Sequence, residues 1–460
     1  MITIVQGKQD LRKLLSQPPA AAGVLYVPTA YVLRRDTVDG VLLCSTLTGE
    51  LVLLSPEEAD AYAQLPTVYT EALDRLIRHH FAVPAGSREA QTVEQLRALL
   101  LRRRENRGII SSYNILPTTH CNARCFYCYE SGIRQTHMSA ETADALADFI
   151  TAHCGGQKVR LNWFGGEPTL GAKCIDHISG RLAERGIPYD AVMTSNGYLF
   201  DEALVAHARD VWKLKSIQIT LDGTEEIYNQ TKAYLHAEGS PFRRVWRNIR
   251  LFVDAGIRVD VRLNLDRHNA EDLGRLIDAL GRDFSGQRTL VLPYVCLLDE
   301  GEGYAPLPHS QGEREALKEQ LVLLQRQLGR YGWRPFSQEK LPSLRLCSCM
   351  ADDPCAIQCT PDGILSKCES QIDQHTVGTL AEGVTERSEV LWWRERRAFN
   401  GCETCPLYPC CIRMLKNCPV KTERCAEYEK SSLLKRSLEL MDAAWVRWKE
   451  TEAKGDAEQK

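Results

Sequence analysis

Residues 110–130 read ISSYNILPTTHCNARCFYCYE, an apolar, strand-like run that leads directly into three closely spaced cysteines. Cys121, Cys125 and Cys128 follow a CxxxCxxC spacing. Thiolates at this spacing hold a [4Fe–4S] cluster by three irons, although such a cluster normally takes four protein ligands. The remaining iron is then open to another ligand, as one position is in catalytic metal sites. The sequence therefore predicts a catalytic iron–sulfur site at the end of a strand.

Strand-like and helical segments alternate after this loop. SAETADALADFITAHC predicts a helix with Ser139 as its N-cap, and the strand-like runs are VRLNWFGGEPTLG, IPYDAVMTSNG, LKSIQITLDG, GIRVDVRLNLD and TLVLPYVCL. This alternation predicts an α/β fold in which parallel strands and outer helices form a full or partial barrel. The turns THC, GGEP, SNG and LDG each follow a strand, at the edge where parallel α/β folds carry their sites.

A structural zinc knuckle is the alternative interpretation of the cysteine loop, with His120 as a fourth ligand. A zinc knuckle does not account for the glycine turns that follow the loop.

The ordered set TTHCNARCFYCYE, LNWFGGEPTL, TSNG and ITLDG resembles the radical S-adenosylmethionine (SAM) superfamily over about residues 109–300. The resemblance implies that Cys121, Cys125 and Cys128 ligate the cluster and that SAM binds its open iron. It assigns to cofactor binding Tyr127 at the adenine, Gly165, Gly166 and Glu167 at the methionyl ammonium group, Asn196 and Thr220 at the ribose or carboxylate, and Lys232 at the carboxylate. Relatives often carry Arg where this chain has Lys232, which keeps the charge but lacks the bidentate fork.

The chemistry implied by this resemblance begins when the reduced cluster passes one electron to the sulfonium of SAM. The cofactor splits into methionine and a 5′-deoxyadenosyl radical, which takes a hydrogen atom from an unactivated carbon. The protein positions that carbon and excludes water.

Eleven further cysteines lie between residues 347 and 425. Their spacing is similar to that of the SPASM extension, which binds two auxiliary [4Fe–4S] clusters. The resemblance implies one ligand set of Cys349, Cys355, Cys368 and Cys418 and a second of Cys402, Cys405, Cys411 and Cys425.

Two features depart from the SPASM pattern. Six residues separate Cys411 from Cys418, where the family usually has three. Cys347, Cys359 and Cys410 are surplus, so Cys347 is an alternative to Cys349 and Cys410 to Cys411. Structural zinc sites are the alternative to both clusters. Glu369 sits where some relatives place a substrate-side acid or base, and a surface carboxylate is its other interpretation.

The formal net charge of −3 over 460 residues gives no indication of nucleic-acid binding or of an anionic membrane surface. Neither a secretory signal nor a membrane span is expected. We therefore expect a cytoplasmic protein whose 18 cysteines mostly bind metal instead of forming disulfides. The scattered Cys44, Cys154, Cys174 and Cys296 are expected to be small buried hydrophobic residues.

The sequence divides into four expected regions. Residues 1–105 form a winged-helix-like module, 109–312 a partial (β/α)6 TIM-type barrel, 335–430 the cysteine-rich SPASM domain, and 431–460 a C-terminal helix and tail. The first region shows three strands and then three helices, with a hairpin turn at 48–50 and Ser55 as a helix N-cap. The basic end of its third helix is expected to be a solvated linker face, formed by Arg102, Arg103, Arg104 and Arg107.

The order of elements in residues 1–105 resembles the peptide-recognition element of maturases for ribosomally made, modified peptides. Such elements add a leader peptide as a strand to an exposed sheet edge; an N-terminal structural cap is the alternative. We expect a maturase that forms a thioether or carbon–carbon crosslink in a precursor peptide, with flavodoxin or ferredoxin as reductant. A sulfatase-maturing, formylglycine-forming enzyme and a non-catalytic iron–sulfur or zinc scaffold are the alternatives.

Overall fold

The computed structural model describes residues 1–15, 21–298, 311–333, 340–372, 374–396, 401–411, 414–418 and 427–458. No helix within these ranges is both long enough and apolar enough to cross a membrane. Cys425, expected as a ligand of the second auxiliary cluster, lies outside the described residues.

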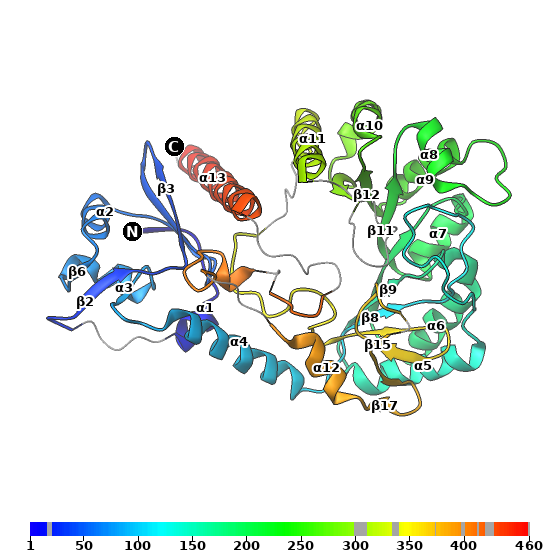
Figure 1. Cartoon of the computed structure of the whole chain (residues 1–460), viewed down its shortest axis with the longest axis horizontal. Coiled ribbons are helices and arrows are strands. Elements are labelled where there is room, and N and C mark those ends of the chain that lie inside the picture. The colour runs from blue at the N-terminus through cyan, green and yellow to red at the C-terminus, as the bar shows by residue number, and fades with distance from the viewer. Residues whose placement is uncertain are drawn as a thin grey trace.

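A sheet of parallel strands forms one half of the molecule, with helices on its outer side (Figure 1). The strands pair in parallel in the order β13-β12-β11-β10-β9-β8. This arrangement confirms the predicted partial barrel. The strands are β8 (Ser112–Ile115), β9 (Val159–Trp163), β10 (Tyr189–Ser195), β11 (Leu214–Leu221), β12 (Arg258–Leu265) and β13 (Val291–Leu297).

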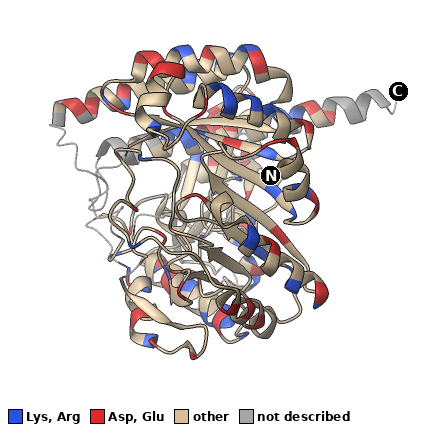
Figure 2. Cartoon of the chain, turned by 90° about the vertical axis from the view of Figure 1, so that its right-hand side faces the viewer, with Lys and Arg blue, Asp and Glu red and all other residues tan. Residues whose placement is uncertain are grey.

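Helices connect these strands and cover their outer face. The hydroxyl of Ser139 accepts the N–H of Thr142 and starts the first of them, as the sequence predicts. Figure 2 shows that acidic and basic residues are interspersed over the solvent side of these helices. They are α5 (Ala140–His153), α6 (Ala172–Glu184), α7 (Glu202–Asp210), α8 (Glu225–Lys232), α9 (Pro241–Asp254), α10 (Ala270–Phe284) and α11 (Gln311–Arg330).

The two faces of each barrel strand differ in burial. On β10, Ala191 and Met193 are buried in the core shared with the helices, whereas Val192 and Thr194 are only half-buried. The same alternation continues on β11, where Gln218 is half-buried between buried neighbours. Side chains alternate across a strand, so the half-buried ones line the inside of the barrel. The inner wall is therefore partly accessible.

The N-terminal region contains more strands than the sequence predicts. The expected strands are β3 (Val32–Thr37), β4 (Gly40–Ser45) and β5 (Leu51–Leu53), and the expected helices are α2 (Pro56–Ala63), α3 (Asp74–Arg78) and α4 (Glu89–Glu105). Ser55 forms a full capping box with Glu58 at the start of α2. The run at 24–36, which the sequence indicates as one strand or a strand pair, contains β2 (Leu25–Pro28) as well as β3. The additional elements are β1 (Ile2–Val5), α1 (Gln9–Leu14), β6 (Thr67–Val68) and β7 (Ala82–Pro84). One sheet has the order β1-β5-β4-β3 and another the order β6-β2-β7.

The C-terminal helix α13 (Glu427–Glu458) packs across the sheet that contains β3, β4 and β5 (Figure 1). Met441 and Trp445 pack on the buried leucines of that sheet. Arg35 forms a two-pronged ion pair with Asp442 at 2.8–3.0 Å. The sequence predicts a helix and a tail over residues 431–460, and the helix continues to Glu458.

The cysteine-rich region adds strands to the barrel sheet. β14 (Ala356–Cys359) pairs in parallel with β8, and β15 (Ile364–Ser366), β16 (Thr376–Thr379) and β17 (Gly383–Val384) follow as antiparallel neighbours. Asn114 joins the two parts, since its side chain accepts from Asn162 at 2.6 Å and donates to Gln358 at 2.7 Å. The helix α12 (Arg387–Arg394) follows these strands.

Candidate functional site

The cysteine loop leaves the carboxyl end of β8 and is anchored at its start by two threonines. The hydroxyls of Thr118 and Thr119 donate to the backbone oxygens of Thr136 (2.9 Å) and Arg134 (2.8 Å). Inside the loop, the N–H of Ala123 donates to Cys121 Sγ at 3.4 Å. Hydrogen bonds to sulfur tune iron–sulfur clusters.

The three loop cysteines are half-buried and interact electrostatically with one another. Burial raises the pKa of Cys121 to about 12, and Glu167, Cys125 and Cys128 raise it too. Thiols with raised pKa values release their protons on binding metal. Among the described residues, no three Cys, His, Asp or Glu side chains stand close enough together to hold a metal ion. The loop supplies the expected donor atoms, and their grouping around one cluster stays a prediction.

Two glycines after β9 allow its backbone to touch the cysteine loop. A Cβ on Gly165 would lie 2.4 Å from the backbone oxygen of Thr118, and one on Gly166 would lie 2.3 Å from that of His120. Gly165 also has a φ of +104°, which side-chain-bearing residues rarely adopt. The N–H of Glu167 donates to the His120 oxygen at 2.8 Å. These glycines therefore hold the loop against the strand ends.

The carboxylate of Glu167 is fully buried and connects two of the predicted turns. It accepts from both the N–H (3.1 Å) and the hydroxyl (2.6 Å) of Thr169. It also accepts from the hydroxyl of Ser195 (2.8 Å) and the N–H of Asn196 (2.8 Å). Oε1 accepts from both groups of Thr169 and from Ser195, and Oε2 accepts from the Asn196 N–H and, at 3.1 Å, from the Ser195 hydroxyl. Burial raises the pKa of Glu167, and these bonds partly offset that rise.

Asn196 reaches the cysteine loop through a side-chain contact. Its Nδ2 donates to Oδ1 of Asn122 at 2.7 Å. The Nδ2 of Asn122 is itself buried and has no hydrogen-bond partner among the described residues. A buried amide of this kind usually has a partner, so it fits an acceptor atom of a ligand next to Cys121.

Tyr127, Asp222 and Lys232 form a buried network beneath the loop. The Tyr127 hydroxyl lies 2.9 Å from both carboxylate oxygens of Asp222. Lys232 Nζ lies 2.7 Å from that hydroxyl and 3.1 Å from Asp222 Oδ2. Burial lowers the pKa of Lys232, but Asp222 and Tyr127 raise it well above its ordinary value. The structure therefore places Lys232 beside Tyr127, with its charge directed at Asp222.

The inner wall of the barrel carries polar side chains at matching heights. Thr220, expected at the cofactor, is half-buried. It pairs with Arg262 on β12, and Arg262 in turn pairs with Tyr294 on β13. The Tyr294 hydroxyl donates to Gln218 at 2.7 Å, and Arg262 Nε donates to Asn264 at 2.8 Å. A wall of this kind suits a polar substrate.

Glu369 and Glu130 lie near this wall. Burial raises the pKa of Glu130 to about 7, and Glu369 raises it further. Burial also raises the pKa of Glu369, which Arg262 lowers in part. Glu369 is nevertheless accessible to solvent, a combination expected of a side chain that faces a cavity. Sequence reasoning missed Glu130 and Arg262, because neither belongs to a recognisable motif.

The structure relates only some of the cysteines of the first predicted auxiliary set to one another. Burial raises the pKa of Cys368 to about 11, and Cys349 and Cys418 make smaller electrostatic contributions in the same direction. Cys355 instead interacts with Asp353, Arg104 and Lys367, and Cys347 has the same neighbours. The pairing of Cys355 with Cys349 stays a prediction.

The second predicted set lies in one segment, apart from Cys425. Cys402 and Cys411 pack in a common apolar cluster with Tyr408, and the N–H of Cys405 donates to the Cys402 oxygen at 2.9 Å. Cys410 interacts with both Cys411 and Cys405, so it remains an alternative to Cys411.

The other cysteines have structural surroundings. The surplus Cys359 is 1% exposed in the barrel core, and the scattered Cys44 and Cys154 are also buried. Cys174 is half-buried against the core. Cys296 is half-buried as well, on β13 in register with Asn264, so neither Cys174 nor Cys296 is as fully buried as predicted.

These observations fit an iron–sulfur cluster with a bound sulfonium cofactor. Thiols with an N–H donor to sulfur, a buried amide nitrogen without a partner among the described residues and a buried carboxylate lie together at the carboxyl ends of parallel strands.

Comparison with known proteins also indicates a domain that binds an iron–sulfur cluster and SAM. Residues 115–280 match the family model described as the radical SAM superfamily. Two curated proteins of Methanococcus maripaludis, each named "Probable GTP 3',8-cyclase", are 30% identical over 95 residues and 26% identical over 151 residues. The alignments cover 20% and 32% of this chain and 31% and 47% of those proteins. The chain thus spans less than half the length of these relatives.

A solved structure, native anSMEcpe with bound AdoMet, matches with a TM-score of 0.53 at 15% identity. The match covers 74% of this chain and 98% of that one. The complex of Streptococcus suis SuiB with precursor peptide SuiA covers 85% of this chain and 95% of its own, with a TM-score of 0.49 at 13% identity. The likeness to anSMEcpe extends the shared fold beyond the barrel.

Proposed function

Because residues 115–280 form a radical SAM domain, we propose that this protein is a radical SAM oxidoreductase that matures a precursor peptide. The observation that carries the proposal is the contact of the GGE turn with the CxxxCxxC loop. Gly165, Gly166 and Glu167 seat the loop on the strand ends, where the inner wall of the barrel is accessible.

The residues of the chain have separable roles in this proposal. Cys121, Cys125 and Cys128 would hold the cluster, and Asn122 and Glu167 would face the amino-acid part of the cofactor. The bound cofactor supplies a 5′-deoxyadenosyl radical that takes a hydrogen atom from the substrate. Tyr127, fixed by Asp222 and Lys232, would hold the adenine. Arg262 and Glu369 would orient the peptide at the inner wall.

The auxiliary cysteines support an oxidative outcome. Closed [4Fe–4S] clusters at the two C-terminal sets would accept the second electron as a thioether or carbon–carbon crosslink forms. The electrostatic interaction of Cys368 with Cys349 and Cys418 supports the first set, and the packing of Cys402 and Cys411 in one apolar cluster supports the second.

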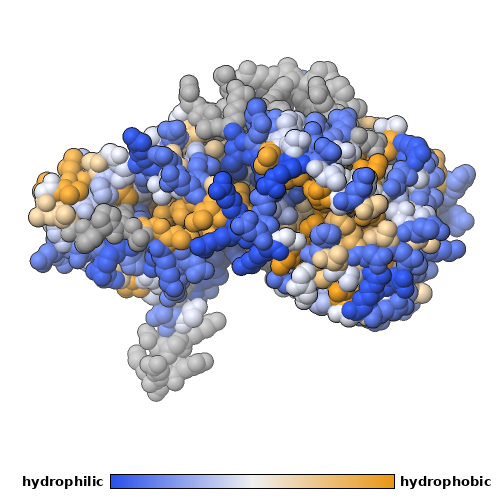
Figure 3. Space-filling model, turned by 90° about the horizontal axis from the view of Figure 1, so that it is seen from below, coloured by the Kyte–Doolittle hydropathy of each residue, from blue (hydrophilic) through white to orange (hydrophobic). Residues whose placement is uncertain are grey.

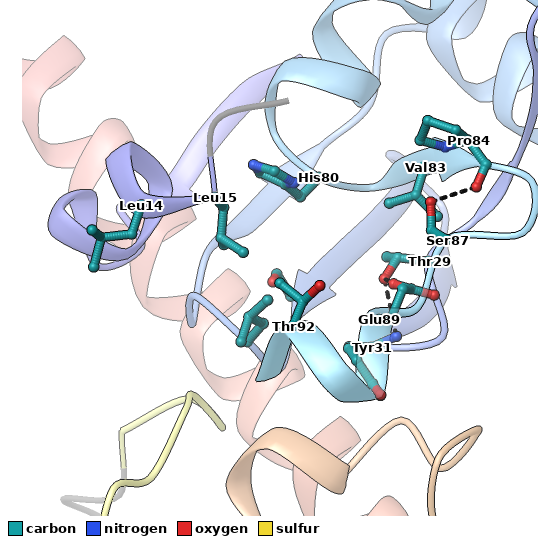
Figure 4. A pocket seen from close by; sticks show the side chains of 12 residues that line it. Leu14, Leu15, Thr29, Tyr31, His80, Val83, Pro84, Ser87, Glu89 and Thr92 are labelled. Atoms are coloured by element: carbon teal, nitrogen blue, oxygen red, sulfur yellow. Dashed lines mark hydrogen bonds between the residues drawn. The ribbon is translucent and has the colours of Figure 1, made fainter. Parts of the chain in front are cut away.

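The N-terminal module supports a peptide substrate with a leader. β3 stands at the edge of its sheet, where a peptide strand can add. The module also has a cavity of about 280 Å³ between α1, β7 and α4. Figure 4 shows side chains from these elements around it, among them Leu15, Val83 and Glu89. Such a cavity would take an apolar leader side chain.

The central experiment measures iron and cofactor cleavage under anaerobic conditions. Reconstituted protein is expected to bind about 12 iron atoms, from three clusters of four, and to form 5′-deoxyadenosine after reduction with dithionite. The triple variant Cys121→Ala/Cys125→Ala/Cys128→Ala should lose the product and about 4 of these iron atoms. Cys174→Ala, on the outer helix α6, is the matched control and should retain both. Absence of 5′-deoxyadenosine from the parent protein would disprove the proposal.

A second experiment tests the peptide substrate. Thr92→Trp fills the N-terminal cavity from an exposed position on α4, and Gln95→Trp is its control on the same helix. Short peptides encoded beside the gene serve as probes in a binding titration. Thr92→Trp is expected to weaken binding while 5′-deoxyadenosine still forms without peptide. Equal binding by both variants would contradict the role of the cavity.

A further inference from the structure

The basic end of α4 is more than a solvated helix terminus. Arg102, Arg103, Arg104 and Arg107 are all exposed. Within the described part of the chain, only Arg104 among them has a side-chain hydrogen bond or ion pair. Favourable interaction with a helix C-terminus accounts for cations in the last turn, but Arg107 lies beyond the helix.

A second group of cations meets this helix end from α12. Arg387 and Arg394 both pair with Glu105, at 3.3 and 3.2 Å. Arg394 Nε is buried without a hydrogen-bond partner among the described residues. Lys367 is buried between the same elements, and burial together with Arg394 lowers its pKa to about 8. Cations therefore outnumber the carboxylates here.

A cavity of about 490 Å³ lies between α4, β14 and α12. Arg104, Arg387 and Arg394 line it on its polar side, and Ile109 and Val390 belong to its apolar wall. Figure 1 shows α4 running along the lower side of the molecule to end beside α12. Figure 3 views that side and shows a strongly hydrophilic band across the middle, with apolar areas on both sides.

This cationic site borders the cysteine-rich region of residues 335–430. Arg104 Nη1 lies 3.9 Å from Cys347 Sγ and 3.5 Å from Asp353 Oδ1. The cavity is also lined by Pro354 and Ala356, which flank Cys355 in the sequence. The basic surface, defined here as Arg102, Arg103, Arg104, Arg107 and Arg387, thus lies beside Cys347 and the segment of Cys355, an expected ligand of an auxiliary cluster.

We propose that the basic surface docks a small acidic electron-transfer protein of the flavodoxin or ferredoxin class. Complementary charge steers such encounters, and electron-transfer complexes have small interfaces. A positive patch on a chain of net charge −3 that adjoins cysteines matches this partner in the sign of its charge and in its position. The apolar wall of the cavity would receive a side chain of the partner. This proposal rests on the proposed function in one respect: the chain must be a redox enzyme that needs an electron donor.

The test compares Arg103→Glu/Arg107→Glu with the parent protein in titrations with a flavodoxin, at low and at high salt. The charge-reversed variant is expected to bind about ten-fold more weakly or worse at low salt, and the parent should lose affinity as salt rises. Arg282→Glu/Arg330→Glu, a pair of exposed reversals on α10 and α11, is the matched control and should bind as the parent does. Thermal unfolding checks that all three proteins are folded.

Equal affinity of the parent and the Arg103→Glu/Arg107→Glu variant would overturn the proposal. Tighter binding of a short RNA duplex than of flavodoxin by the parent would also overturn it, in favour of a nucleic-acid surface. Formation of 5′-deoxyadenosine with dithionite needs no docking protein, so its absence would count against the proposed function alone. The variant should retain that dithionite-driven product.

Discussion

Gly166 shows how strictly single atoms are placed at the cysteine loop. An added Cβ would lie 2.3 Å from the His120 oxygen and 2.6 Å from that of Thr119. Gly166→Ala is therefore expected to lower the free energy of unfolding by about 1–3 kcal/mol, the usual cost of overpacking, and to reduce bound iron. Urea unfolding and iron analysis measure both.

Gly180→Ala on α6 is the control, because nothing lies within 4 Å of its added Cβ. It should leave iron unchanged and stabilise the helix slightly. Full iron content in Gly166→Ala would mean that the glycine contact does not position the loop.

His80 gives the N-terminal module a dependence on pH. Burial, with Arg12 and His79, lowers its pKa to about 4, below the value of about 6.5 in an unfolded chain. The unfolded state therefore binds more protons between these values, so stability falls as pH falls through that window. From pH 7.5 to 5 the parent should lose about 2 kcal/mol of stability through this residue.

His80→Asn tests this dependence, because Asn tolerates the φ of +58° at this position. Urea midpoints at the two pH values should differ less in the variant than in the parent. An identical pH dependence would show that His80 is not the titrating group.

At the residue scale, the sequence predicts which residues belong to the site better than it predicts which side chains contact one another. The spacing identified Cys121, Gly166 and Glu167 because a short motif fixes them together. The contacts of Lys232 with Tyr127 and of Asn196 with Asn122 join positions 105 and 74 residues apart. Such pairs depend on how strand ends meet in space, and no local pattern encodes them.

Among the elements, α13 packs on the N-terminal sheet, a contact that its sequence does not predict. Met441 is fully buried against the N-terminal sheet. Met441→Ala should destabilise the protein by about 2–5 kcal/mol, whereas Val446→Ala, at 52% exposure on the same helix, should have little effect. Thermal or urea unfolding compares the two. Equal effects would mean that α13 does not stay on that sheet.

The barrel strands could be predicted because each is an apolar run bounded by a turn and followed by a helix. The strands β6 and β17 have two residues each, and β1 and β14 have four. Runs this short carry no periodicity, and their pairing partners stabilise them. β14 forms because β8 offers an open edge, which is information from a segment more than 240 residues away.

At the scale of the whole molecule, the N-terminal module packs against residues 402–411, the segment of the second predicted auxiliary set. Tyr31 stacks on Tyr408 with ring centres 5.9 Å apart, and its hydroxyl donates to the Glu403 oxygen at 3.0 Å. Removing iron with a chelator is therefore expected to speed hydrogen exchange around Tyr31 and Thr46, which also bonds to Pro406. Exchange in β10 should stay unchanged. Loss of protection only at the CxxxCxxC loop would contradict a cluster at Cys402 and Cys405.

This packing could not be read from the sequence. Tyr31, Leu96 and Tyr408 share an apolar cluster, yet each alone has the pattern of an ordinary local core residue. The division into regions treats 1–105 and 335–430 as separate, because contacts between distant segments leave no mark on composition.

The continuous hydrogen bonding from β8 to β14 has a mechanical consequence. The two parts share one sheet, so the strand register, not the length of the connecting chain, sets the span between Cys121 and Cys368. A stiff frame of this kind keeps any tunnelling distance constant during turnover. Engineers who lengthen the connection before β14 should leave that span unaltered, whereas a one-residue slip of β14 would shift it by about 3.3 Å.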